Sequence, residues 1–126
     1  MNYTIEKNEH YSLIKTDLTL MNQHTCHKLR EKVLHEVASN SKYVIVNIEG
    51  VKECNAEGTR ELIQLALDLR NTNGMLILTH ADDHFTRLFN KADITFIPTD
   101  MEAIDFVFMD QLEKQYLDMD NDSSKA

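Results

Sequence analysis

The apolar positions along the chain change their spacing several times, and each change predicts an element. Short alternating or clustered apolar runs at residues 3–5 and 11–16 predict two strands. Between residues 22 and 39 the apolar side chains recur at steps of three and four, which predicts an amphipathic helix. The run 43–48 is rich in β-branched residues and apolar almost throughout, as is typical of a strand covered on both faces.

The second half of the chain continues to alternate between the two periods. Its patterns predict, in order, a helix at 59–71, a buried strand at 75–79, a short helix capped by Asp82 or Asp83, a strand at 94–97 stopped by Pro98, and a last helix capped by Thr99 or Asp100. Asn73 and Gly74 suit the left-handed turn that ends a helix.

This order of strands and helices predicts a single α/β domain. We expect a mixed, mostly parallel sheet of about five strands with about four helices and right-handed crossovers. The domain is predicted to cover residues 1–117. Residues 118–126 are polar and are predicted to form a flexible C-terminal tail.

Composition narrows the classes of function. The chain has 126 residues, 42% of them hydrophobic and 27% charged, which is ordinary for a soluble globular domain. A net charge of −8 argues against a nucleic-acid partner, which requires a concentrated basic surface. No apolar run is long enough to insert in a bilayer, and the first residues lack a secretory pattern, so a cytoplasmic location is expected.

The loop 53–58 joins a predicted strand to a predicted helix, a junction that often presents a reactive group. Its central residues, Asn55 and Ala56, have side chains that are neither nucleophiles nor acid–base groups. Cys54 precedes a helix N-terminus, which can activate a thiol, but we expect it to point into the core. The chain has no glycine-rich phosphate loop with its lysine and no nucleophile elbow. We therefore expect no enzymatic activity and no cofactor.

Histidines occur in two closely spaced pairs, His24 with His27 and His80 with His84. A structural zinc site needs four converging ligands, and no second ligand pair accompanies either one. Surface or helix-capping roles are expected, with no metal site. Residues 80–84 follow a strand, where α/β sheets commonly bind ligands, so this edge is a weak candidate for a small-ligand or nucleotide site.

Five consecutive segments resemble those of STAS domains, the module shared by sulfate transporters and anti-sigma-factor antagonists. The resemblance spans roughly residues 3–110. It rests on the order and spacing of YVIVNIEGV, ECNAEG, TRELIQLALDLRNTNG, MLILTH and DDHFTRLFNKADI. The resemblance implies the α/β fold already predicted and a role in protein binding.

The loop departs from the family pattern, which reads hydrophobic-Asp-Ser-x-Gly with a serine that a partner kinase phosphorylates. Cys54 stands at the hydrophobic position, Asn55 at the aspartate, Ala56 at the serine and Gly58 at the glycine. Since alanine has no hydroxyl, phosphorylation at that position is not expected. Thr59 is a weak alternative phosphosite because it does not match the family position.

The resemblance implies a non-enzymatic regulatory module that binds an anti-sigma factor or a kinase-like regulatory protein. The expected contact residues are Glu53, Asn55, Ala56, Glu57, Gly58, Thr59, Ile63 and Leu67. Glu57 has two interpretations, as a permanent negative charge in place of phosphate or as a favourable helix N-terminal charge. Ile63 and Leu67 also have two interpretations: neighbouring helices cover them, or they belong to the surface that contacts a partner.

Other roles remain open at this point. STAS domains also serve as structural subunits of ABC-type lipid transporters and of stress-signalling complexes, and the chain fits either use. A homodimer is also compatible with the sequence.

Overall fold

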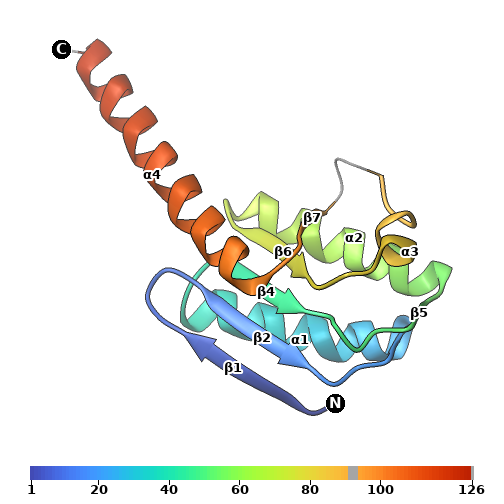
Figure 1. The fold of residues 1–126 in the computed structure, drawn as a ribbon. Coiled ribbons are helices and arrows are strands. Elements are labelled where there is room, and N and C mark those ends of the chain that lie inside the picture. Colours follow the sequence, from blue (N-terminus) through green and yellow to red (C-terminus); the bar gives the residue numbers. More distant parts are fainter. Residues whose placement is uncertain (91–93, 126) are drawn as a thin grey trace.

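The computed structural model describes the backbone of residues 1–90 and 94–125, and the side chains of 1–90 and 94–117. Figure 1 shows the arrangement of its elements. In chain order they are β1 (Tyr3–Lys7), β2 (Ser12–Thr16), β3 (Leu20–Met21), α1 (Gln23–Ser39), β4 (Tyr43–Asn47), β5 (Glu53–Cys54), α2 (Ala56–Asn71), β6 (Met75–Thr79), α3 (Asp83–Thr86), β7 (Thr95–Ile97) and α4 (Asp100–Lys125).

The main sheet has five strands in the order β1-β2-β4-β6-β7. β1 pairs with β2 in an antiparallel hairpin, and the remaining neighbours are parallel. β4 and β6, two of the inner strands, are apolar almost throughout because helices lie on both faces of the sheet. The predicted fold class, a mixed and mostly parallel sheet with four helices, is confirmed.

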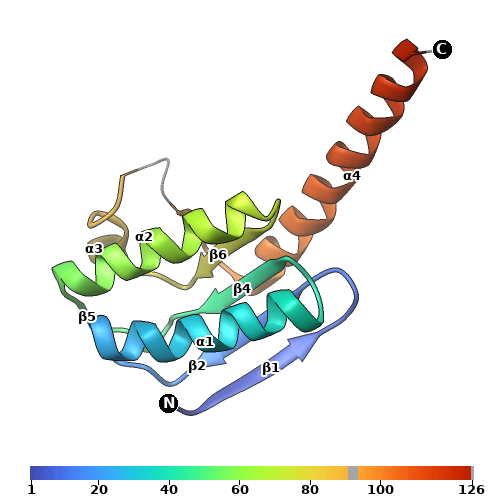
Figure 2. The ribbon, with the colours of Figure 1, turned by 180° about the vertical axis from the view of Figure 1, so that it is seen from behind.

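The two faces of the sheet have different covers. Helices α1, α2 and α3 lie on one face, and the first turns of α4 lie on the other (Figures 1 and 2). Successive side chains of a strand point to opposite faces, so Val44 and Val46 enter the core under α1 and α2 while Ile45 enters the core under α4. The core beneath α1 and α2 is the larger one, because it contains most of the buried apolar residues.

The structure differs from the sequence-based prediction in two strands. β3 and β5 form a separate two-stranded parallel sheet, with Leu20 opposite Glu53 and Met21 opposite Cys54. Each strand has two residues, which is too short to give an alternating apolar pattern. This small sheet lies immediately before α1 and α2, so it fixes where both helices begin.

The C-terminal end of α2 corrects another detail. The left-handed residue is Asn73, with φ of 63°, and Gly74 does not have a positive φ. A Cβ built on Gly74 would lie 2.5 Å from the Lys42 carbonyl oxygen, so glycine is needed there for close approach to the chain before β4.

α4 extends further than the sequence predicts. Its backbone is helical to Lys125, through most of the range 118–126 for which a flexible tail is expected. The flexibility of that range stays a prediction. The division into a domain at 1–117 and a tail likewise stays a proposal.

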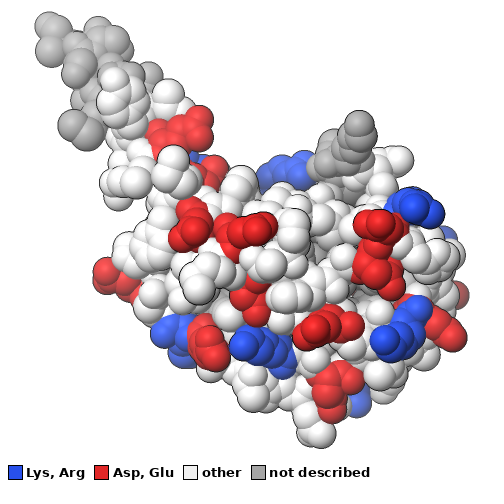
Figure 3. Space-filling model, in the orientation of Figure 1, with Lys and Arg blue, Asp and Glu red and all other residues white. Residues whose placement is uncertain are grey.

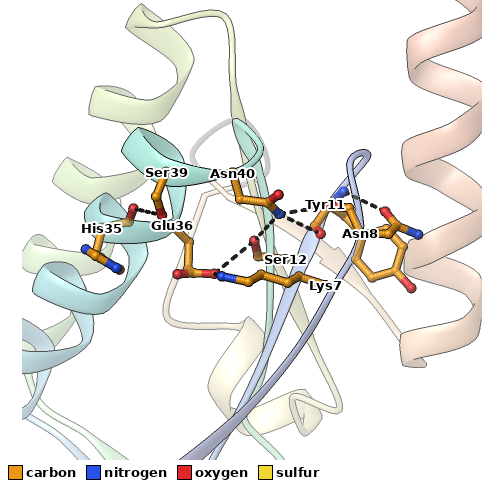
Figure 4. A network of polar contacts seen from close by, with 8 residues as sticks. All are labelled: Lys7, Asn8, Tyr11, Ser12, His35, Glu36, Ser39 and Asn40. Carbon is orange, nitrogen blue, oxygen red and sulfur yellow. Dashed lines mark hydrogen bonds and ion pairs between the residues drawn. The ribbon is translucent and has the colours of Figure 1, made fainter.

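A buried carboxylate fastens the β1–β2 hairpin to α1 (Figure 4). Glu36 is 1% exposed, and its Oε1 accepts from Lys7 Nζ at 3.1 Å and from the Ser12 hydroxyl at 3.4 Å. One turn further, Asn40 Nδ2 donates to the Ser12 hydroxyl and to the carbonyls of Asn8 and Tyr11. The buried polar side chains of this network, Ser12 and Glu36, thus each have a partner, as packed interiors require.

Removal of the lysine tests this network. Lys7→Met is expected to lower the free energy of unfolding by about 2 kcal/mol, because the Glu36 carboxylate loses its counter-ion while it stays buried. Lys15→Met is the matched control. Lys15 has nearly the same exposure as Lys7 (46% against 47%), but its partner Glu6 is exposed, so a change within about 0.5 kcal/mol is expected. Equal losses in urea unfolding would contradict this account.

Candidate functional site

Asn55 begins α2 and shapes the loop that precedes it. Its backbone is extended, and its Oδ1 accepts from the Gly58 backbone N–H at 2.8 Å, which is the geometry of a helix N-cap. α2 therefore begins at Ala56, three residues before the predicted start at 59. Ala56 and Glu57, which were expected in a loop, lie in the first turn of a helix.

Gly58 lets α2 approach β3. A Cβ at this position would lie 2.3 Å from the Met21 carbonyl oxygen, a distance that no side chain can occupy. The same carbonyl accepts from the Asn55 backbone N–H at 3.1 Å, and the Thr19 carbonyl accepts from the Lys52 backbone N–H at 2.7 Å. The loop is thus fixed by backbone contacts from an earlier part of the chain, so the groups it presents are held in place.

One face of α2 points away from the core. Ala56, Arg60, Ile63 and Leu67 follow one another at steps of four, three and four residues, which places them in a line on the helix surface. Ala56 and Arg60 are exposed, Ile63 is half-buried against the core, and Leu67 is 37% exposed. We call these four residues the α2 stripe.

The opposite face of α2 carries the predicted core residues. Leu62, Leu65, Ala66 and Leu69 are all buried, as expected. Ile63 and Leu67 fit different interpretations. Ile63 packs against the core, whereas Leu67 remains a large exposed apolar side chain. Of these two residues, only Leu67 therefore offers substantial apolar area to a partner.

The starts of α1 and α2 lie side by side and enclose a groove. Asn22 caps α1 as Asn55 caps α2, and Arg30 on α1 forms an ion pair with Asp68 on α2. The pKa of Asp68 is lowered, mainly by the hydrogen bond that Arg30 donates to its carboxylate. The groove has a volume of about 530 Å³ and is lined by Asn22, Gln23, His24, His27, Asn55, Glu57 and Glu61.

Acidic side chains border this region. Glu53 and Glu57 are exposed, and Glu57 lies in the first turn of α2, where the helix dipole favours a negative charge. Arg60 lies between Glu57 and the apolar part of the stripe. Sequence reasoning missed Arg60 as a member of the surface, although its four-residue spacing from Ala56 could have indicated it.

Neither cysteine has the environment of a nucleophile. Burial raises the pKa of the Cys26 thiol to about 12, and burial also raises the pKa of Cys54. Cys54 is half-buried, with its Sγ 3.5 Å from the Thr59 hydroxyl. Both thiols are therefore protonated near neutral pH.

Thr59, the alternative phosphosite, has its hydroxyl occupied. It donates to the Asn55 carbonyl at 3.0 Å, and the residue is half-buried. A kinase would have to break this bond to reach the oxygen. Its modification stays a prediction that no contact here supports.

The histidine pairs do not converge on a metal site. Among residues 1–90 and 94–117, no group of three His, Cys, Asp or Glu side chains could hold a metal ion. His27 contacts Glu31 one turn along α1. His80 has a positive φ of 59° and lies 3.9 Å from Asp100, which accepts hydrogen bonds from Asn47 and Thr79. Asp100 thereby anchors the start of α4, and a ligand site at 80–84 stays a prediction.

Comparisons with known proteins bear on the fold. The chain matches no protein-family model and no curated protein sequence. It is similar to the unphosphorylated anti-sigma factor antagonist SpoIIAA, at 18% identity and a TM-score of 0.65, over 84% of this chain and 97% of that one. It is also similar to a variant of RsbS from Moorella thermoacetica, at 14% identity and a TM-score of 0.70, over 90% and 99%.

The murine anion transporter Slc26a9 gives a third match, at 12% identity and a TM-score of 0.69. The match covers 82% of this chain and only 18% of the transporter. The chain has the STAS fold. Where the helices of this STAS fold are described, none has both the length and the apolar character of a bilayer span.

The cap of α2 gives a direct stability test. Asn55→Ala should lower the free energy of unfolding by about 1 kcal/mol, since the Gly58 N–H loses its acceptor. Asn55→Asp should retain most of the stability because it keeps the acceptor and adds a charge that the helix dipole favours. Thermal or urea unfolding measures both. An Asn55→Ala protein as stable as the parent would show that the cap does not hold the loop.

Gly58→Ala tests the close approach of α2 to β3. The new methyl group would overlap the Met21 carbonyl, and we expect a loss of at least about 2 kcal/mol. Gly50→Ala is the matched control, because its Cβ would lie 3.3 Å from the Leu18 carbonyl oxygen and needs only a small adjustment. A Gly58→Ala protein no less stable than Gly50→Ala would contradict the packing described here.

Proposed function

We propose that the chain is a cytoplasmic, non-enzymatic regulatory module that binds an anti-sigma factor or a related kinase-like protein. The binding surface consists of residues 53–55 and the α2 stripe, and it is not switched by phosphorylation at Ala56. The observation that carries the proposal is the position of Ala56, exposed in the first turn of α2 at the head of a line that ends at Leu67.

The chemistry at position 56 explains why the residue type matters. A phosphoserine adds about −1.5 to −2 charges and three acceptor oxygens. Because position 56 is the first residue of the stripe, this charge would lie inside any interface that covers Arg60 and Leu67. Alanine cannot accept phosphate, so the surface keeps the form that an unmodified serine would give it.

Each part of the surface has a distinct role in binding. Leu67 supplies apolar area, and Arg60 can make charged hydrogen bonds that become strong once water is excluded. Glu53 and Glu57 at the border would steer a partner with basic groups, which affects the association rate more than the affinity. The proposed contact residues are the exposed and half-buried ones among those predicted from the sequence, with Arg60 added. Gly58 is buried against Met21 and shapes the surface without contributing a contact.

A second candidate, a structural subunit of a larger assembly, is favoured by one comparison. The chain is similar to a protein in a structure of the stressosome, a signal integration and transduction hub. The identity is 13% and the TM-score 0.61, over 82% of this chain and 95% of that one. Purification of the native complex separates the candidates. Copurification of a multi-subunit signalling particle, or of an ATPase with a permease, would select this second role.

Binding assays with anti-sigma-type kinases from the same genome test the first proposal. Ala56→Glu and Leu67→Ser should each weaken binding by about tenfold, one through charge and the other through lost apolar contact. Leu34→Ser is the matched control, because Leu34 on α1 has the same 37% exposure as Leu67 but lies outside the surface. Binding to no such kinase, or equal effects of Leu34→Ser and Leu67→Ser, would contradict the proposal.

Phosphate incorporation tests the missing switch. With radiolabelled ATP and a kinase that binds, the parent chain should take up no phosphate in residues 53–59, whereas Ala56→Ser should take it up at the new serine. Stoichiometric labelling of the parent loop would refute the claim of a lost phosphosite. An Ala56→Ser protein that binds the kinase but is never labelled would show that the loop is not presented as a substrate.

A further inference from the structure

Helix α4 carries most of the exposed apolar side chains that the structure describes. Six of the ten large apolar residues with high exposure lie on it: Met101, Phe106, Met109, Leu112, Tyr116 and Leu117. Met109 and Tyr116 are each 66% exposed, compared with 37% for Leu67 in the α2 stripe. Exposed apolar side chains that gather on one element indicate a contact surface, whereas isolated ones do not.

The first turns of α4 are held firmly against the sheet. Ala103 and Val107 are fully buried in the core beneath α4. Further along, the Tyr43 hydroxyl donates to Asp110 at 2.7 Å and accepts from Lys114 at 2.9 Å. These contacts fix which side of the helix faces the body.

The apolar side chains lie on the side that faces away from the body. At about 100° per residue, Met109 and Tyr116 are about 200° and about 180° around the helix from the buried Val107. Figures 1 and 2 show α4 projecting beyond the sheet, so neither the sheet nor another helix covers this side. A shallow hollow of about 540 Å³ lies along it, lined by Phe106, Met109, Asp110, Leu112, Glu113 and Tyr116.

The charges around this face select the kind of partner. Residues 100–117 contain five acidic side chains, at positions 100, 102, 105, 110 and 113, and one basic side chain, Lys114. Lys114 is already bound to Asp110 and Tyr43. Figure 3 shows acidic side chains gathered where α4 leaves the body. The apolar face therefore has a negative border.

That border disfavours two occupants. A second copy of α4 would place Asp105 and Glu113 against acidic side chains of the same kind, and like charges across an interface oppose association. The surface of an anionic lipid leaflet would be repelled in the same way. A protein segment with an apolar strip and Lys or Arg at its edges satisfies both parts of the surface.

We propose that α4 is a second docking site, which binds an apolar protein segment bordered by basic residues. Its apolar contacts are Phe106, Met109, Leu112 and Tyr116, and its charged contacts are Asp105 and Glu113. The site differs from the α2 stripe, because α2 covers one face of the sheet, the first turns of α4 cover the other, and α4 projects beyond the sheet (Figures 1 and 2). One chain could therefore join two proteins.

A labelled model peptide tests the chemistry of this site. The probe is a synthetic helical peptide of leucine and lysine with leucines at steps of three and four, and fluorescence anisotropy with the full chain measures its affinity. We expect the double variant Met109→Ser/Tyr116→Ser to bind about tenfold more weakly and Leu34→Ser to bind within about twofold of the parent. Far-UV circular dichroism and thermal unfolding establish that each variant is folded.

The charged border is tested separately. Glu113→Lys should weaken peptide binding severalfold while thermal stability is retained, and salt should weaken binding to the parent. A peptide with the same composition but a scrambled order should bind poorly. Equal binding of the scrambled peptide, or no effect of the double variant, would overturn the proposal.

Two further outcomes also overturn it. Sedimentation that shows a dimer of the parent, dissociated by Met109→Ser/Tyr116→Ser, would identify a second copy as the occupant. Binding of the parent to phosphatidylcholine vesicles, lost in the same double variant, would identify a lipid surface.

Discussion

The close approach of α2 to the end of β3 is the constraint on which the presented surface depends. It exists because position 58 has no side chain, so the first turn of the helix can rest on the Met21 carbonyl. The β3–β5 pair then holds the loop from one side, and the Asn55 cap holds it from the other. A larger residue at position 58 would move the start of α2 and, with it, each residue of the stripe.

In the proposed function this constraint lets the loop bind a partner without taking part in a reaction itself. A loop fixed by backbone contacts can present a side chain in a defined position, which a phosphorylation switch requires. Here the presented side chain is the methyl group of Ala56, while both nearby thiols are protonated and the Thr59 hydroxyl is engaged. In the proposed function the same scaffold serves as a docking surface. The projecting α4 adds a second apolar surface with a different charge pattern.

Much of this arrangement could be predicted from the sequence, because long periodic segments carry strong signals. The strands at 43–48 and 75–79 and the inner face of α2 follow directly from the spacing of their apolar residues. A loop before this helix was also predicted, although the helix begins earlier than its apolar pattern does, because its first turn carries Ala56 and Glu57.

The remainder depends on tertiary contacts that no local pattern encodes. β3 and β5 are two residues each and exist because they pair with each other across more than thirty intervening residues. Gly58 was named as the glycine of the family pattern and as a contact residue, whereas its close packing against Met21 is evident only in the structure. The exposure of the apolar residues of α4 after Val107 was not predicted, since only the structure shows that the sheet ends before they do.

Hydrogen exchange of the chain, alone and in complex with the kinase-like partner that it binds, tests the central claim most directly. The claim predicts that amides of residues 53–67 gain protection on binding, and that Ala56→Glu removes this gain while the core of β4 and β6 remains protected. Protection confined to other parts of the chain, with residues 53–67 unchanged, would contradict it.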